Sequence, residues 1–238
     1  MAMNIDFLGR WSSNSIKGER TASILIDDEL LIECGPHTVE AMLDLNHDPM
    51  AIKTVAITHM HLDHYVGLAE LLWYRAIYGS RETLIITGPR GIKNNTEHLL
   101  QEVRTPEAFE INTLFYEDRP VDTIVPFRAN HLIDDNGYRY EKGGKTLFYS
   151  GDTAYSENVV KGAEKADYLF HEMTYTDDKE KDATFWKHST YSDVMRVVKE
   201  SKAKRLVPVH LTTGTLALVN SLAHNHEDII VPGGRIIL

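Results

Sequence analysis

The chain has 238 residues, 42% of them hydrophobic, which is enough for a substantial buried core. Its formal net charge of −10 argues against a broad surface for polyanions such as nucleic acid. Cys34 is the single cysteine, which excludes an intramolecular disulfide and a cysteine-built zinc site, so any metal must be held by histidine and carboxylate.

Runs of apolar and β-branched residues alternate along the chain with helical patterns. We predict strands over residues 4–9, 21–27, 30–34, 53–58, 83–87, 111–116, 122–127, 138–141, 146–151, 167–172, 205–210 and 234–238. We predict helices over residues 36–45, 65–78, 89–103 and 191–203. The third helix has Pro89 in its first turn. The second buries a stripe formed by Tyr65, Leu68, Ala69, Leu72, Ala76 and Ile77.

Strands interleaved with helices through both halves predict an α/β layered architecture, in which helices cover the sheets. No repeat or long linker interrupts the pattern, so we expect one domain over residues 1–238. No run of about 18 apolar residues occurs, and the first residues lack a basic start followed by an apolar core. We therefore expect a cytoplasmic protein with no membrane partner.

The stretch ITHMHLDHYVGL, residues 57–68, places three histidines and one aspartate directly after an apolar run. In an extended chain, residues two apart point the same way, so His59 and His61 can bind one ion from one side. The turn into the next helix directs Asp63 and His64 toward a second point nearby. Neutral imidazole and carboxylate suit zinc, manganese or iron, and a catalytic site leaves one coordination position for water.

Three further candidate ligands stand where later apolar runs stop: His131, Asp152 and His210. Each one alone would be interpreted as a surface or hydrogen-bonded residue. Together with the histidine cluster they predict a pair of divalent metal ions at one edge of a sheet.

The motif HMHLDH resembles the HxHxDH signature of the metallo-β-lactamase superfamily, and the order His131, Asp152, His210 resembles the rest of that family's ligand set. The resemblance spans nearly the whole chain and implies an αββα sandwich with two mixed β-sheets flanked by helices. It also implies that one metal is held by His59, His61 and His131 and the other by Asp63, His64 and His210, with Asp152 bridging them.

Smaller motifs resemble the ribonuclease Z-like members of that superfamily. These are IECGPHT near the start, HLIDDNGYRYEKGGKTLFYSGDT from His131 to Thr153, LFHEMTY and the HST at residues 188–190. The interval from His188 to His210 is 22 residues, as in those relatives. The resemblance places Glu172 and His188 at functional positions.

These residues suggest a mechanism for a metal-dependent phosphodiesterase or endonuclease. Two metal ions can lower the pKa of a bridging water and neutralise charge on a phosphoryl oxygen. Asp63 is then both a ligand and a proton acceptor. A poor alkoxide leaving group needs a general acid, and we assign that role to His188, oriented and kept cationic by Glu172.

One feature departs from ribonuclease Z, whose tRNA-binding arm is inserted between the histidine and aspartate equivalent to His131 and Asp152. Here these residues are 21 apart, which leaves room for a hairpin only. Without the arm, and with a negative net charge, a small phosphodiester is expected, or RNA bound with the help of a partner subunit. The resemblance also suggests a homodimer.

Two alternative functions stay open. The same metal centre can hydrolyse carboxylic esters, sulfate esters or lactones. The second alternative is a non-hydrolytic role, either as an iron-centred oxidoreductase or as a metal-dependent binding module. Diiron reductases of this fold usually have a glutamate where His61 stands and need a flavin partner domain, and none fits in 238 residues.

Other conspicuous residues are given ordinary roles. Surface or loop positions are expected for His37, His47, His98, His224 and His226, and Cys34 is expected to be packed. In a regular strand His171 points to the face opposite Glu172, and we assign it no role. We expect Trp73 to pack rather than to bind a ligand. For Trp186, which lies beside His188, packing and lining of the cleft are equally supported.

Overall fold

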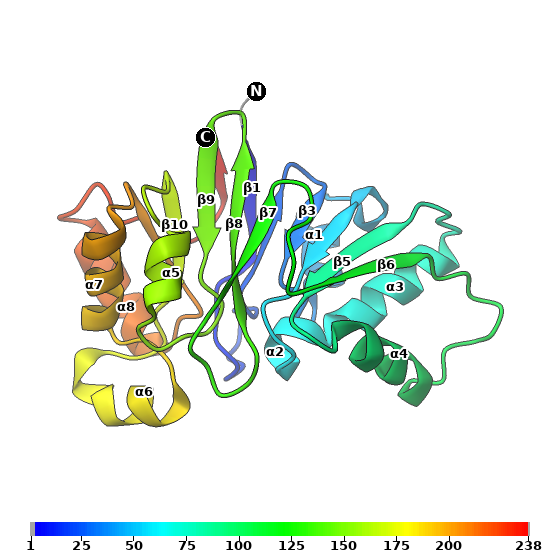
Figure 1. Cartoon of the computed structure of the whole chain (residues 1–238), viewed down its shortest axis with the longest axis horizontal. Helices are drawn as coiled ribbons and strands as arrows, with labels where there is room; N and C mark the ends of the chain where they lie inside the picture. The colour runs from blue at the N-terminus through cyan, green and yellow to red at the C-terminus, as the bar shows by residue number, and fades with distance from the viewer. Residues whose placement is uncertain (1–2, 238) are drawn as a thin grey trace.

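The computed structural model describes residues 3–237, and two β-sheets lie face to face between two layers of helices (Figure 1). The first sheet has the order β12-β1-β2-β3-β4-β5-β6, and the second has the order β11-β10-β9-β8-β7. Both sheets contain parallel and antiparallel neighbours. The predicted sandwich of two mixed sheets flanked by helices is confirmed.

Every predicted strand range overlaps a strand of the structure, and residue 238, at the end of the last range, lies outside the described residues. The first sheet is formed by β1 (Asn4–Gly9), β2 (Ser23–Ile26), β3 (Leu30–Ile32), β4 (Thr54–Ala56), β5 (Leu84–Gly88), β6 (Thr113–Glu117) and β12 (Arg235–Ile237). The second sheet is formed by β7 (Ile124–Arg128), β8 (Asn136–Lys142), β9 (Lys145–Tyr149), β10 (Tyr168–Glu172) and β11 (Leu206–Val209).

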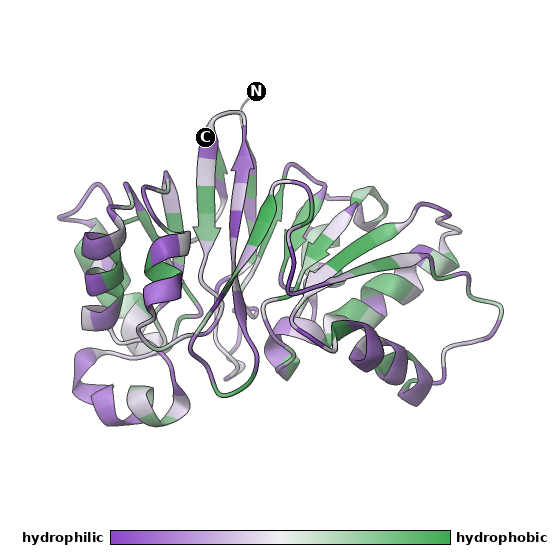
Figure 2. Cartoon of the chain, viewed as in Figure 1, coloured by the Kyte–Doolittle hydropathy of each residue, from purple (hydrophilic) through white to green (hydrophobic). Residues whose placement is uncertain are grey.

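Alternating side chains of the strands build separate cores on the two sides of each sheet. In β2, Ile24 and Ile26 join the core between the sheets, whereas Leu25 joins the core beneath the helices. In β10, Phe170 faces the other sheet and Leu169 faces the outer helices. This alternation with period two follows from strand geometry, and it lets a nearly continuous apolar run serve two cores (Figure 2).

The helices cover the outer faces of the sheets. Among residues 3–237 they are α1 (Thr38–Asp44), α2 (Leu62–Tyr65), α3 (Gly67–Ile77), α4 (Ile92–Glu102), α5 (Glu157–Gly162), α6 (Glu180–Trp186), α7 (Tyr191–Ser201) and α8 (Thr213–Ala223), with short 3-10 turns η1 (Pro49–Ala51) and η2 (Asp177–Lys179). Side chains of α1, α3 and α4 pack on the first sheet, and side chains of α5, α7 and α8 pack on the second. No helix in the described part of the chain has the length and apolar character needed to cross a membrane.

Several details of the helix prediction were wrong. The helices α5, α6 and α8 were not predicted, because their sequences mix Gly, Thr, Asn and charged residues and show little helical periodicity. In α8, capping by the Thr212 side chain and burial of Val219 stabilise the helix instead. The third predicted helix begins at Ile92, after a turn containing Pro89. Ile77 does not belong to the buried stripe of α3, since 62% of it is exposed.

The segment between His131 and Asp152 contains only the hairpin of β8 and β9, joined by Gly143 and Gly144. In Figure 1 the tip of this hairpin lies at the sheet edge opposite α2. The hairpin therefore cannot act as an arm beside the residues that follow β4.

Two glycines let the chain after β4 approach the chain after β3. A Cβ atom on Gly67 would lie 2.0 Å from the carbonyl oxygen of Gly35, and one on Gly35 would lie 1.9 Å from the carbonyl oxygen of Asp63. Any side chain at these positions would push α2 and α3 away from the loop that follows β3.

We predict that Gly67→Ala lowers the free energy of unfolding by about 2 kcal/mol or more, because the added methyl group overpacks a backbone contact. Gly214→Ala is the matched control, since its Cβ would have its nearest neighbour, in Thr176, 3.8 Å away. That control should leave stability unchanged or raise it by up to about 1 kcal/mol. Urea unfolding curves measure both, and equal stability of the two variants would refute the prediction.

Candidate metal centre

Polar residues follow the carboxyl ends of parallel strands at one edge of both sheets. In the first sheet, Glu33 follows β3 and His59 follows β4. In the second, Asp152 follows β9, Glu172 ends β10 and His210 follows β11. The carboxyl ends of parallel strands are a common place for ligand sites in open sheets. In Figure 1 this edge lies at the bottom, where α2 and α6 are found.

His59, His61, His131 and Asp152 form one group whose ligand atoms all lie within 4.8 Å of one another. The distance from His59 Nε2 to His61 Nδ1 is 2.9 Å, and that from His131 Nε2 to His61 Nδ1 is 3.3 Å. Three imidazole nitrogens thus point at one small volume, as ligands of a single cation do.

Asp63, His64 and His210 form a second group within the same limit. Asp63 Oδ2 lies 3.2 Å from Nε2 of His64 and 3.2 Å from Nε2 of His210. Both imidazoles raise the acidity of Asp63, so its pKa lies well below the usual range although burial opposes this. This carboxylate therefore stays charged beside two nitrogen donors.

Asp152 connects the two groups. Its Oδ2 atom lies 3.7 Å from His59 Nε2, 3.3 Å from His64 Nε2 and 3.6 Å from His210 Nε2. Burial raises its pKa, but the charges on His210 and His64 outweigh burial and lower it well below the usual value. The structure thus brings all seven predicted ligands into one site, with Asp152 at its centre.

In four of these histidines, the Nδ1 atom, which faces away from the site, lies within hydrogen-bond distance of a side-chain or backbone oxygen. Asp135 Oδ2 lies 2.8 Å from His59 Nδ1, and Glu33 Oε1 lies 3.0 Å from His64 Nδ1. Thr174 Oγ1 lies 2.8 Å from His210 Nδ1, and the Lys187 carbonyl lies 3.1 Å from His131 Nδ1. In each case Nε2 is left to face the site, which is the arrangement that orients histidine for metal binding.

Sequence reasoning missed Asp135, Glu33 and Thr174 as functional partners. All three stand inside motifs that carried the resemblance, and Asp135 lies in the loop between His131 and β8. Asp135 and Glu33 are fully buried, and burial raises the pKa of both carboxyl groups. An acidic residue buried at such cost is a signal of function, but only the fold reveals the burial.

Glu172 and His188 form an ion pair beside the two groups. Glu172 Oε1 accepts hydrogen bonds from His188 Nδ1 at 2.9 Å and from the backbone N–H groups of Thr153 and Ser189. Its Oε2 accepts from the hydroxyl and the backbone N–H of Thr174. Burial lowers the pKa of His188, but the charges on Glu172 and Asp152 and the hydrogen bond to Glu172 raise it overall to about 9.

The residues present fit a pair of divalent cations. Nε2 of His64 is buried and makes no well-aligned hydrogen bond, although carboxylate oxygens of Asp63 and Asp152 lie close to it. Two carboxylates and five converging imidazoles in a buried site form a donor set of the kind that holds divalent cations. The nitrogen and oxygen donors suit zinc, and also manganese or iron. His188, Asp152 and His210 lie close enough to form a third ligand group, but Glu172 already occupies His188 Nδ1.

The site opens into a cleft of about 580 Å³. His61, Asp63, His131, His188 and His210 line it, together with Trp186. Of the two roles left open for Trp186, the structure selects lining of the cleft.

The other conspicuous residues lie outside both ligand groups. His37, His98, His224 and His226 are exposed and Cys34 is packed, as predicted. His171 is buried with Nδ1 2.8 Å from the Glu172 carbonyl.

The predicted surface position of His47 was wrong. Its side chain is buried, with Nδ1 2.6 Å from Asp28, which follows β2, and Nε2 3.7 Å from Asp6 in β1.

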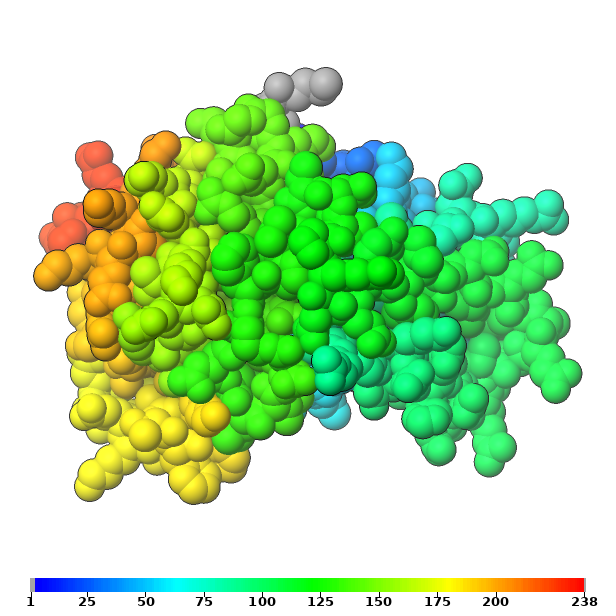
Figure 3. All heavy atoms as spheres, viewed as in Figure 1, coloured from blue at the N-terminus to red at the C-terminus, as the bar shows by residue number. Residues whose placement is uncertain are grey.

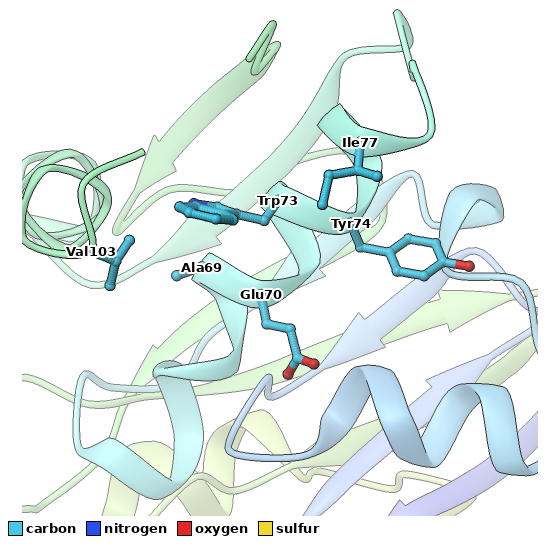
Figure 4. Close-up of a pocket in the computed structure, with 6 residues that line it drawn as sticks. All are labelled: Ala69, Glu70, Trp73, Tyr74, Ile77 and Val103. Atoms are coloured by element: carbon cyan, nitrogen blue, oxygen red, sulfur yellow. The ribbon is translucent and has the colours of Figure 1, made fainter. Parts of the chain in front are cut away.

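Trp73 packs as predicted, in contact with Phe109, and its indole N–H donates to Thr105. It also lines an apolar groove of about 440 Å³ on α3, with Tyr74, Ile77 and Val103 (Figure 4). None of the predicted site residues lines this groove.

Comparisons with known proteins agree with this geometry. The chain is 27% identical to ribonuclease Z of Sulfurisphaera tokodaii, over 77% of this chain and 78% of that protein. The metallo-beta-lactamase fold protein YhfI from Bacillus subtilis matches with a TM-score of 0.81 and 22% identity, covering 100% of both chains. Human tRNase Z, short form, matches with a TM-score of 0.78 and 23% identity, covering 89% of this chain and 93% of that one.

The resemblance predicted from the sequence motifs is thereby confirmed. The family model described as the β-lactamase superfamily domain matches residues 29–211. That range holds both ligand groups, Glu172 and His188. The chain therefore belongs to the family described as the β-lactamase superfamily domain.

Proposed function

We propose that this metal-dependent hydrolase cleaves phosphodiester bonds with two divalent metal ions, in the manner of a ribonuclease Z-like enzyme without the tRNA-binding arm. One observation carries the proposal. Asp152 Oδ2 lies between two groups of converging imidazoles, and a separate imidazole–carboxylate pair, His188 and Glu172, stands beside them.

The two groups would each hold one ion. His59, His61 and His131 would bind the first, and Asp63, His64 and His210 the second, with Asp152 shared. When bound, such ions supply a water nucleophile of lowered pKa and a Lewis acid for phosphoryl oxygens. Asp63 faces the cleft, where its carboxylate can take a proton from the attacking water.

His188 is the proposed general acid. Its Nδ1 is bound to Glu172, and among residues 3–237 no hydrogen bond engages its Nε2. With a pKa of about 9 the ring is cationic at neutral pH and can pass the Nε2 proton to the leaving alkoxide. Glu172 accepts donors on both oxygens, so it fixes the ring rather than taking the proton itself.

The curated relatives support a phosphodiester substrate, since the matched proteins are named ribonuclease Z. The hairpin in place of the arm favours a small phosphodiester, or RNA held by a partner subunit. A homodimer and a cytoplasmic location stay predictions.

A hydrolase of carboxylic esters, sulfate esters or lactones is the second candidate. The observation that favours it is the apolar part of the cleft lining, which includes Leu62, Leu132 and Trp186. The non-hydrolytic alternatives have no comparable support, because the comparisons point to hydrolases.

The first test is hydrolysis of bis(p-nitrophenyl) phosphate by protein stripped of metal and reloaded with zinc or manganese. Activity should disappear on stripping and return with metal. Full metal loading without activity on any phosphodiester would overturn the proposal and favour the esters, which p-nitrophenyl acetate and a lactone would then report.

We predict that His188→Ala keeps the metal content of the wild type and slows turnover about 10²- to 10⁴-fold on phosphodiesters with alkoxide leaving groups. Turnover of p-nitrophenyl esters should fall much less, because p-nitrophenolate leaves without a proton. Equal losses on both kinds of substrate would contradict the general-acid role.

We predict that Glu33→Gln weakens metal binding about 10- to 100-fold, because His64 loses the carboxylate that orients it. Asp28→Asn is the matched control, since Asp28 holds His47 in the same way but away from the site. Competition with a chromogenic chelator measures both variants without relying on activity. Unchanged affinity in Glu33→Gln would show that this carboxylate does not support the metal site.

A further inference from the structure

Part of the lining of the cleft is apolar and takes no part in the proposed chemistry. Leu62, Leu132 and Trp186 all line it, yet 67%, 48% and 49% of these residues are exposed. Apolar and aromatic side chains at the mouth of a cleft that also holds a few converging polar groups are typical of a ligand-binding site. Tyr175 lines the cleft as well, and we call the three lining residues Leu132, Tyr175 and Trp186 the aromatic shelf.

The aromatic shelf begins at the proposed acid and at the ligands. Trp186 ends α6, two residues before His188, and Leu132 directly follows His131. The ring of Tyr175 lies 6.0 Å from that of His188, centroid to centroid. A substrate whose scissile phosphate sits between the ligand groups and His188 therefore has its neighbouring substituent within reach of the shelf.

The charges around the cleft disfavour a long polyanion. None of the cleft-lining residues in the described part of the chain is a lysine or arginine. Lys187 Nζ, from the residue before His188, donates to the His131 carbonyl at 3.3 Å. The segment of η2 and α6 carries Asp177, Asp178, Glu180 and Asp182 against two lysines, and it projects at the lower left of Figure 3. Polynucleotides are bound largely through cations that contact phosphates, and this rim offers few.

The size of the cleft agrees with a small substrate. Its volume of about 580 Å³ lies within the usual range for sites that enclose one small molecule. Planar rings stack on Trp and Tyr, and every nucleobase has a face that can do so.

We propose that the aromatic shelf binds a nucleobase adjoining the scissile phosphate, so that the substrates are nucleotide-sized phosphodiesters and Trp186 determines this specificity. The inference rests on the proposed function. Specificity then comes from stacking, in place of the phosphate contacts that a longer RNA would need.

The test uses the dinucleotide TpT and two analogues in which a tetrahydrofuran abasic residue replaces one nucleoside or the other. The scissile phosphate and its alkoxide leaving group are the same in all three. The wild type, loaded with zinc or manganese, should prefer TpT over at least one analogue in kcat/KM. Trp186→Ala should lower kcat/KM for TpT about 5- to 150-fold and remove the preference, which is the range expected for one stacked base.

Two variants separate stacking from damage to α6. Trp186→Phe keeps an aromatic face and should retain most of the preference. Phe185→Ala is the matched control, because Phe185 is 70% exposed, neighbours Trp186 and does not line the cleft, so its kcat/KM should stay within about twofold of the wild type. Equal losses in Phe185→Ala and Trp186→Ala, or equal rates on all three substrates in the wild type, would overturn the inference.

A binding experiment distinguishes failure of the proposed function from failure of the inference about the shelf. If the metal-loaded wild type cleaves no phosphodiester, calorimetric binding of thymidine 5′-phosphate and 2-deoxyribose 5-phosphate replaces the rate comparison. Tighter binding of the base-bearing ligand that is lost in Trp186→Ala would support the shelf although the proposed reaction is wrong. Equal binding of the two ligands would reject the shelf as well.

Discussion

The carboxylate of Asp152 is the constraint around which this edge of the molecule is built. It is 3% exposed, and its Oδ2 atom lies within 3.7 Å of imidazole nitrogens from both sheets. A buried charge is tolerated only when it is compensated, and the strand ends deliver nitrogen donors to this point in an arrangement able to hold a cation. The convergence of β4, β9 and β11 on one edge meets that need, and the two helical layers serve to hold the sheets in place.

The surrounding hydrogen bonds explain why the imidazoles converge and do not scatter. Asp135, Glu33 and Thr174 each take the outer nitrogen of one histidine, so the inner nitrogen can point only at the site. Thr174 also donates its hydroxyl proton to Glu172, which leaves its oxygen to accept from His210. One hydroxyl thereby links the ligand group of His210 to the ion pair of Glu172 and His188.

The cleft joins two surfaces of opposite character. Its floor is formed by charged and nitrogen-bearing side chains from strand ends, from α2 and from nearby loops, and its mouth is formed by apolar residues on loops and on α6. Such a division suits a reaction in which the floor performs one general chemistry and the rim selects the substituent. An apolar mouth can select a substrate without an inserted arm and with little positive charge near the site, as in this chain.

The sequence by itself determined the strands and the alternation with helices, which depend on local rules. The sandwich and the seven candidate metal ligands were predicted with the added help of motifs that resemble a known superfamily. Period-two alternation, the spacing of HMHLDH and the end of each apolar run are set by the geometry of a few neighbouring residues. Tertiary structure alone decided the partners Asp135 and Glu33, the burial of His47 and the helix α8. Their roles arise where segments distant in the chain meet. The sequence around a carboxylate does not indicate whether packing will bury it against an imidazole or leave it exposed to water.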